Sequence, residues 1–113
     1  MGTRATGEAR YGTGADDVHR TFLRVLESLP GFHIQSSDPA TGRVNAARGM
    51  NLATWGENVD VTVRALGPGD TAVTVSSRLK FGLFDWGRNR RNVDQILGSA
   101  GALLPQPMPP PPG

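Results

Sequence analysis

The clearest pattern in the chain is an alternation of apolar and polar residues between positions 58 and 79. Apolar side chains occupy most of the alternate positions on both sides of a Gly-Pro-Gly-Asp segment at 67–70. They are Val59, Val61, Val63, Ala65, Val73, Val75 and Leu79. A period of two is typical of strands with one buried face, and the glycines and proline favour a turn. The pattern therefore predicts a β-hairpin that buries one of its two faces.

A second hairpin is predicted over residues 32–46, where apolar and polar residues again alternate. Its turn is the segment 37–42, Ser-Asp-Pro-Ala-Thr-Gly. The side chain of Asp38 can accept a hydrogen bond from the backbone two residues on, and Gly42 can adopt a positive φ. Residues 4–11 predict a weaker strand at a sheet edge. Residues 49–56 predict a strand extension or a bulged corner, and residues 81–87 another corner.

Two helices are predicted from apolar residues at helical spacing. The stripe of the first consists of Val18, Phe22, Val25, Leu26 and Leu29. Thr13 and Asp16 form a capping-box pattern before it, and Pro30 ends it. The second helix begins between Asp85 and Asn89 and ends at Pro105. Its stripe consists of Val93, Ile96, Leu97, Ala100 and Leu104.

The predicted element order is β-α-β-β-β-β-α, which indicates an α+β fold. Strands grouped between two helices favour a five-stranded antiparallel sheet with both helices packed on one face. We expect the strand order 1-5-4-3-2. A single domain is predicted over residues 1–104, followed by a disordered proline-rich tail over 105–113.

Composition excludes several classes of function. The 113 residues include no cysteine, so disulfides, thiolate zinc sites and cysteine nucleophiles are excluded. The formal net charge of +2 is too small for a strong nucleic-acid signal. No apolar run reaches the length of a membrane span, and the polar first residues do not form a signal peptide. We therefore expect a cytoplasmic protein; the sequence does not determine its oligomeric state.

A short internal repeat is the most distinctive feature of the sequence. Trp55-Gly56-Glu57-Asn58 recurs as Trp86-Gly87-Arg88-Asn89. The two Trp-Gly corners could face a common ligand and form a composite site. Alternatively, each tryptophan closes an end of the core, while its glycine adopts a backbone shape that other residues avoid.

These stretches carry a resemblance to a known family. Thr41-Gly42-Arg43-Val44, Trp55-Gly56-Glu57 and Asp85-Trp86-Gly87-Arg88-Asn89-Arg90-Arg91-Asn92-Val93 resemble a family of small uncharacterised bacterial domains. That family shows similar Trp-Gly-Glu and Asp-Trp-Gly-x-Asn-x-x-Asn-Val stretches. The resemblance spans roughly residues 11–104. It implies a bacterial origin and one domain over that span, and it implies no activity.

Three arginines crowd the start of the second predicted helix: Arg88, Arg90 and Arg91. The positive end of the helix dipole disfavours them there, so something negative is expected close by. An anion could bind at this point. Alternatively, carboxylates of the chain could pair with the guanidinium groups; the candidates are Asp85, Asp94 and Glu57.

Glu57 falls on the inward phase of its strand, where an unpaired carboxylate is costly. A salt bridge or a bond to the backbone of the second corner would satisfy it. A catalytic acid is the alternative, but no partner base is identifiable. His19 is expected on the polar side of the first helix and His33 on the outward phase of its strand. Because neither has a companion at metal-ligand spacing, we expect no metal. The serines show no nucleophile-elbow context and no phosphate loop precedes a helix, so we also expect no cofactor and no catalytic residue.

The sequence thus favours a non-enzymatic binding or interaction module whose partner is a protein or an anionic ligand. The predicted contact surface comprises Trp55, Glu57, Asn58, Asp85, Trp86, Arg88, Asn89, Arg90 and Arg91. The alternative is a carrier of an apolar small molecule, because helices lying across an antiparallel sheet resemble the helix-grip architecture. The small core argues against that alternative, since it leaves little apolar material to line a cavity.

Overall fold

The computed structural model describes residues 4–48, 57–79 and 88–105, and for Leu79 the backbone alone. The elements follow the predicted order. They are β1 (Arg4–Tyr11), α1 (Ala15–Ser28), β2 (Phe32–Asp38), β3 (Arg43–Arg48), β4 (Glu57–Gly67), β5 (Asp70–Leu79) and α2 (Arg88–Gly101).

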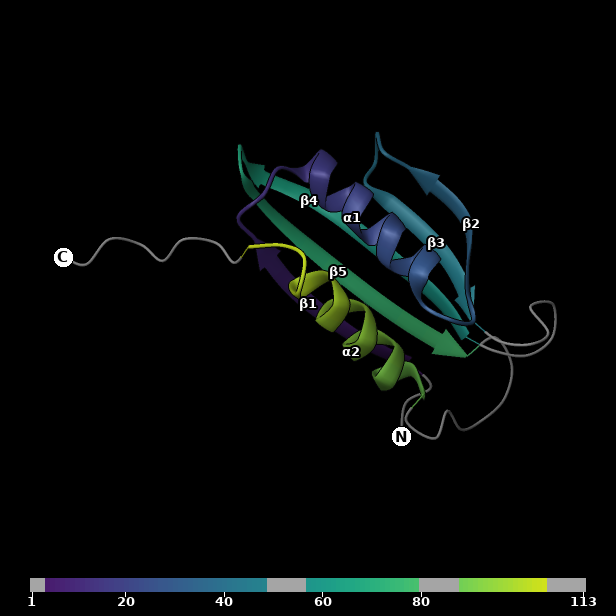
Figure 1. Cartoon of the computed structure of the whole chain (residues 1–113). Coiled ribbons are helices and arrows are strands. Elements are labelled where there is room, and N and C mark those ends of the chain that lie inside the picture. Colours follow the sequence, from purple (N-terminus) through teal and green to yellow (C-terminus); the bar gives the residue numbers. More distant parts are fainter. Residues whose placement is uncertain (1–3, 49–56, 80–87, 106–113) are drawn as a thin grey trace.

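The five strands form one antiparallel sheet in the order β1-β5-β4-β3-β2, with β1 and β2 at its edges. Both helices lie across the same face of this sheet (Figure 1). The predicted α+β class, the strand order and the edge position of residues 4–11 are confirmed. We call the face under the helices the inner face and the opposite one the outer face.

The core lies between the inner face and the helices. α1 packs mainly against β2 and β4, whereas α2 packs against β1 and β5. Val18, Phe22 and Leu26 of α1 are fully buried, as the helical stripe predicts. A Cβ atom on Gly7 of β1 would lie only 2.6 Å from Cγ1 of Val93, so a glycine at this position lets α2 approach the sheet closely.

The turn between β2 and β3 forms as its residues predict. The backbone N–H of Ala40 donates a hydrogen bond to Oδ1 of Asp38 over 3.0 Å. Gly42 has a φ of 73°, and a Cβ atom there would lie 2.1 Å from the carbonyl oxygen of Val63. Both the conformation and the close approach to β4 therefore require glycine at position 42.

Two local predictions in α1 are wrong. The residue before the helix is Gly14, in an extended conformation, and no side chain caps the helix start. The predicted capping box of Thr13 and Asp16 is therefore absent; the carbonyl of Thr13 instead accepts a 2.6 Å hydrogen bond from the hydroxyl of Thr71 on β5. His19 is 5% exposed, not solvated. It lies three residues before Phe22, which places both on the same side of the helix.

Pro105, the first residue of the predicted tail, contacts the domain. The N–H of Gly12 donates a 2.9 Å hydrogen bond to the carbonyl of Pro105, which ties Pro105 to the domain. Residues 106–113 lie outside the described residues, so the disordered tail stays a prediction there, as do the corners at 49–56 and 81–87. Neither described helix is long and apolar enough to cross a membrane.

Candidate functional site

Polar side chains gather at one end of the inner face, where the strands begin or end beside the start of α2. Arg48 of β3 lies directly opposite Glu57 of β4, and Glu57 lies opposite Leu79 of β5. We call the group the polar cluster; its members are Arg48, Glu57, Ser77, Asn89 and Asn92. All of them except the half-buried Arg48 are at most 3% exposed.

Strand and helix periodicity place these polar groups in the interior. Glu57 shares the inward phase of β4 with Val59, and Ser77 of β5 pairs with Val59 across the sheet. Asn89 and Asn92 lie on the buried side of α2, together with Val93 and Ile96. The periodicity of two strands and one helix therefore places polar side chains within an otherwise apolar layer.

The side-chain amide of Asn92 lies between a cation and a carboxylate. Nη1 of Arg48 donates a 2.7 Å hydrogen bond to Oδ1 of Asn92. Nδ2 of Asn92 donates to Oε1 of Glu57 over 3.0 Å and to Oγ of Ser77 over 3.1 Å. The oxygen of the amide thus faces the cation and its N–H groups face the acceptors, as the charges require.

Three further contacts extend the cluster. The hydroxyl of Ser77 donates a 2.7 Å hydrogen bond to Oδ1 of Asn89. Nη1 of Arg48 also donates to Oε1 of Gln95 over 3.1 Å, while its guanidinium carbon lies 4.7 Å from the ring centroid of Phe32. These contacts offset the cost of removing the polar groups from water and tie β3, β4 and β5 to α2.

Glu57 pairs with an arginine, as one interpretation of the sequence requires. Its Oε2 atom lies 3.7 Å from Nη2 of Arg88, within ion-pair range but beyond a hydrogen bond. The Arg88 side chain is 51% exposed, so solvent weakens this pair. The carboxylate is thus satisfied mainly through Asn92 on one oxygen and loosely through Arg88 on the other.

The structure brings only part of the predicted contact surface together. Glu57 and Asn89 belong to the polar cluster, and Arg88 reaches its edge. Asn58 lies on the outer face, where its Oδ1 accepts a 3.4 Å hydrogen bond from Nδ2 of Asn45. Neighbouring residues of a strand point to opposite faces, so Glu57 and Asn58 cannot serve one site.

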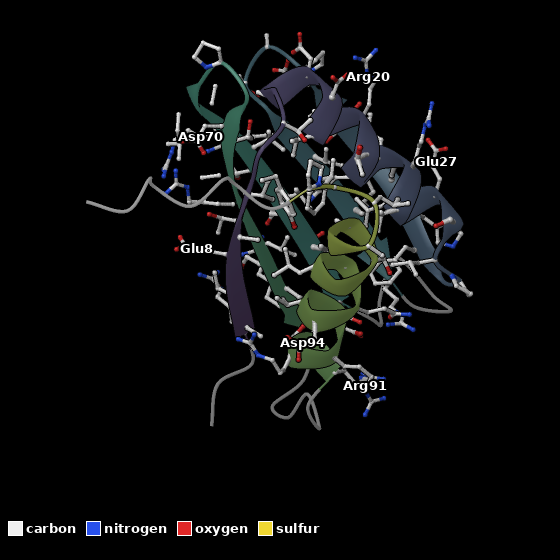
Figure 2. All side chains as sticks on the ribbon, turned by 60° about the vertical axis from the view of Figure 1, so that its left-hand side comes forward. Glu8, Arg20, Glu27, Asp70, Arg91 and Asp94 are labelled. Carbon is white, nitrogen blue, oxygen red and sulfur yellow. The ribbon has the colours of Figure 1, made fainter. Side chains whose placement is uncertain are left out.

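The three arginines of α2 point in different directions. Arg90 pairs with Asp94 over 3.5 Å and donates a 2.9 Å hydrogen bond to the carbonyl of Thr6 on β1. Arg91 is exposed and projects away from the domain (Figure 2); no carboxylate among the described residues lies within ion-pair distance of it. The predicted pairing is confirmed for Asp94 and Glu57. The three guanidinium groups do not converge on one anion site.

Trp55, Asp85 and Trp86 lie outside the residues that the structure describes, so their part in a site stays a prediction. Their place in the sequence is nevertheless informative. Arg48 and Glu57 flank the segment 49–56, and Arg88 directly follows the segment 80–87. Both Trp-Gly corners are thus attached by the chain to residues at the polar cluster.

Sequence reasoning missed Arg48, Ser77 and Asn92, although each carried a signal. Ser77 falls on the inward phase of β5, between Val75 and Leu79, and Arg48 continues the phase of Val44 and Ala46. Asn92 follows Asn89 by three residues on the buried stripe of α2. Polar residues on the apolar phase of adjacent elements would have indicated the cluster.

Several hollows lined by described residues lie away from the polar cluster. One of them, about 640 Å³, opens on β2, β3 and β4, and its lining includes Asn45 and Asp60. Asn45 donates a 2.8 Å hydrogen bond to Asp60 there. A smaller one, about 290 Å³, lies beside His19 at the opposite end of the domain. Among the described residues, no three His, Asp or Glu side chains gather in a way that could hold a metal ion.

Comparison with known proteins gives a fold and no family. No family model matches the sequence, and no curated protein matches it. The resemblance to small uncharacterised bacterial domains therefore stays a prediction. Solved structures, in contrast, match with probability 1.00 over most of the chain.

Three of these structures match over most of this chain and most of their own chain. A START superfamily protein from Mycobacterium smegmatis has a TM-score of 0.62 at 8% identity, covering 91% of this chain and 97% of that one. The Zhui aromatase/cyclase from Streptomyces sp. R1128 has a TM-score of 0.55 at 12% identity, covering 86% and 92%. A norcoclaurine synthase from Thalictrum flavum, in complex with a transition-state analogue, has a TM-score of 0.58 at 10% identity, covering 86% and 92%.

The chain has a helix-grip fold. At these identities the likeness shows the fold alone. It also corrects one prediction, that the chain is not an enzyme, because aromatase/cyclases and a synthase are built on this same fold. The fold therefore gives no ground for excluding catalysis.

Proposed function

We propose that this domain binds a small organic molecule with an apolar body at the polar-cluster end of its inner face. The observation that carries the proposal is the polar cluster itself, a hydrogen-bonded group of buried side chains in an otherwise apolar layer. The fold supports the proposal, since a solved norcoclaurine synthase of this fold is in complex with a transition-state analogue.

The stability of the fold does not require buried charged and amide groups at this position. Replacing buried ionic groups by apolar residues of similar volume is often neutral or stabilising. Elsewhere the inner face uses such residues, including Val61, Val63, Val73 and Val75, all of them buried. A carboxylate, a guanidinium and two amides at one end therefore indicate recognition of a polar group on a ligand.

An apolar ligand body would find suitable neighbours beside the cluster. Phe32 of β2 lies in the same cross-strand row as Arg48, and Val59 follows Glu57 on the inward phase of β4. Val93 and Ile96 continue the buried side of α2 beyond Asn92. These side chains offer apolar contact directly adjacent to the polar anchor.

The carrier alternative thus has better support than a surface for a protein or an anionic partner. The arginines expected to form that surface diverge, with Arg90 against β1 and Arg91 in solvent. Asn58 lies on the opposite face of the sheet. The described contacts supply no shared patch for a macromolecule among the residues predicted to bind one.

An NMR titration with naphthalene tests the proposal. We expect saturable shifts of the backbone amides of Val59, Ser77 and Val93, and of the side-chain amide of Asn92. The outer-face amides of Thr62 and Thr74 should stay unchanged. Shifts confined to the outer face, or no saturable shift at all, would contradict small-molecule binding at the inner face.

Two adjacent serines of β5 provide matched variants. Ser77 lies on the inner face within the polar cluster, whereas Ser76 lies on the outer face and contacts Thr6. Ser77→Leu removes the hydroxyl that bonds Asn89 and Asn92 and places a larger side chain in the cluster, so it should weaken naphthalene binding about tenfold, the effect of about 1.4 kcal/mol. Ser76→Leu should leave the affinity unchanged. Circular dichroism at the titration temperature checks that both variants are folded.

A further inference from the structure

Among the described residues, two buried side-chain atoms have no hydrogen-bond partner, and one of them is Nε2 of His19. The other buried residues of α1 are apolar: Val18, Phe22, Val25 and Leu26. An apolar side chain at position 19 would avoid the cost of a buried nitrogen that makes no hydrogen bond. The unmet hydrogen-bonding capacity of His19 therefore indicates a partner from outside the chain.

His19 forms part of the wall of the hollow of about 290 Å³ at the end of the domain opposite the polar cluster. The start of α1, the β2–β3 turn and the last part of β4 lie together at this end and surround the hollow (Figure 1). Its lining includes the polar residues Asp16, Thr41 and Arg64, and small residues such as Ala15 and Ala65. Pockets for drug-sized ligands measure about 300–1,000 Å³, so this hollow suits a smaller ligand, about one ring in size.

A ligand can approach this hollow from solvent. Pro39, Ala40 and Thr41, which form one of its walls, are exposed. Nε2 of His19 is itself buried, so the imidazole has to turn toward the hollow to meet a ligand. The terminal torsion of a histidine side chain has a broad energy profile, so the ring can turn without entering an unfavourable rotamer. His19 can therefore reach a ligand without a change in the backbone of α1.

The charged groups of the lining favour a neutral ligand. Asp16 contributes a carboxylate and Arg64 a guanidinium, and both residues are exposed. A cation would be repelled by Arg64 and an anion by Asp16, whereas a neutral molecule meets neither penalty. Both groups can also form hydrogen bonds with a neutral ligand, since a carboxylate accepts and a guanidinium donates.

A hydroxyl group matches the polar groups of this lining. In a neutral imidazole one ring nitrogen donates a hydrogen bond and the other accepts one, and a hydroxyl can pair with either. A hydroxyl can likewise donate to Asp16 and accept from Arg64. A compact ring with several hydroxyls can thus bond His19 while its C–H groups contact Ala15 and Ala65.

We propose that this hollow is a second binding site, which takes one neutral polyhydroxylated ring, such as a sugar unit or a cyclitol. One hydroxyl of the ring bonds Nε2 of His19, and others meet Asp16 and Arg64 at the rim. The site lies away from the polar cluster and does not rest on the proposed function.

A titration of the unmodified protein with myo-inositol tests this inference. Hydroxyls surround the ring of this neutral probe, so its binding does not depend on the stereochemistry of one particular sugar. The chain has two histidines, and NMR of the imidazole nitrogens reports on each of them. We expect a saturable shift at His19, with a dissociation constant on the order of 1 mM, and no shift at His33, which is exposed on β2.

Two charged probes, phosphate and methylammonium, separate the outcomes. At equal ionic strength each should shift His19 less than myo-inositol does. Saturation of His19 at a lower concentration of either charged probe would identify an ionic site and overturn the inference. The inference also fails if myo-inositol causes no saturable shift at His19, or shifts only the side-chain amide of Asn92. None of these results bears on naphthalene binding at the polar cluster, so the two proposals fail independently.

The two histidines provide matched variants. His19→Phe keeps an aromatic ring but removes both nitrogens, and should weaken myo-inositol binding about tenfold or more, measured at the backbone amides of Thr41 and Gly42. His33→Phe changes the exposed histidine of β2 and should keep the affinity. An unchanged affinity in His19→Phe would overturn the inference. If that variant does not fold, the imidazole shifts of the unmodified protein decide the question.

Discussion

The two ends of the inner face are built from the same strands, but one is mainly apolar whereas the other holds a cluster of polar side chains. At the end near the β4–β5 turn, Tyr11 and Phe22 meet edge to face with ring centroids 5.9 Å apart, and Val63 lies opposite Val73. At the other end the same layer holds the polar cluster, centred on Asn92. We refer to them as the apolar end and the polar end.

The difference shows how one sheet can serve two purposes. Apolar packing is non-directional and contributes most of the free energy of folding. Buried hydrogen bonds contribute little net stability but fix side chains in one geometry. β4 passes from Glu57 at the polar end to Val63 at the apolar end within one strand, so the rigid apolar end can hold the polar end in place.

The largest effect is expected from truncation at the apolar end. Phe22 is fully buried against Tyr11. Phe22→Ala should lower the free energy of unfolding by about 3–5 kcal/mol, because it removes a large ring and leaves a cavity. Chemical denaturation measures the change. A loss under about 1 kcal/mol would contradict the assignment of stability to this end.

A smaller loss is expected at the polar end. Asn92→Ala removes the amide between Arg48 and Glu57 and should cost about 1–3 kcal/mol, the penalty for unsatisfied buried partners. Asn45→Ala is the matched control, since Asn45 is an amide of the outer face that also contacts a carboxylate, Asp60. Its loss should be smaller, because water can replace those bonds. Equal losses would contradict a special role for the buried amide.

The stability that Tyr11 contributes at the apolar end should depend on pH. Burial raises the pKa of the Tyr11 phenol above its ordinary value of 10.0, because the charged form is desolvated. The folded state thus holds this proton more tightly than the unfolded state does. The contribution to stability is complete below pH about 10 and is lost as the pH rises through the folded pKa.

Thermal unfolding of the wild type and of Tyr11→Phe across this range measures that contribution. The Tm of the wild type should fall more steeply above pH about 10 than the Tm of the variant, in line with the proton linkage. Tyr11 is the single tyrosine of the chain, so phenolate absorbance reports its ionisation directly. Parallel pH profiles of the two proteins would contradict the shift.

The smallest effect is expected on the exposed side of α2. Arg91→Gln should change the free energy of unfolding by less than about 0.5 kcal/mol, because the side chain is exposed and makes no ion pair with a described carboxylate. Arg88→Gln should cost up to about 1 kcal/mol through its loose pair with Glu57. Denaturation of both variants checks this order; a larger loss for Arg91→Gln would reverse it.

Patterns confined to one element were predictable from the sequence. Alternation in residues 57–79 predicted the central hairpin and the burial of Glu57, because the period of two determines which side chains share a face. The Asp38 turn followed from local hydrogen bonding in the same way. In α1, by contrast, a contact from β5 to the carbonyl of Thr13 accompanies a helix start without the expected capping box.

The composition of the site depended on contacts between distant elements. Asn92 reaches Glu57 across 35 residues of sequence, and Arg48 reaches Asn92 across 44. Periodicity indicates that a polar side chain points inward, but it does not identify the partner that another element brings to it. The three arginines of α2 show the converse, since residues adjacent in sequence diverge around a helix.

The pairing of β1 with β5 joins the first strand of the chain to the last one. The first strand to be synthesised must therefore wait for its partner. β2, β3, β4 and β5 pair as consecutive neighbours through short connections, whereas Thr6 of β1 contacts Ser76 of β5 across 70 residues. Long-range pairing is slow because a long loop must close first. On the ribosome, β1 emerges first but can pair only after β5 has been synthesised. Until β1 pairs with it, β5 presents an open strand edge that can pair with other chains. The pairing of the N-terminal strand therefore protects the protein against aggregation.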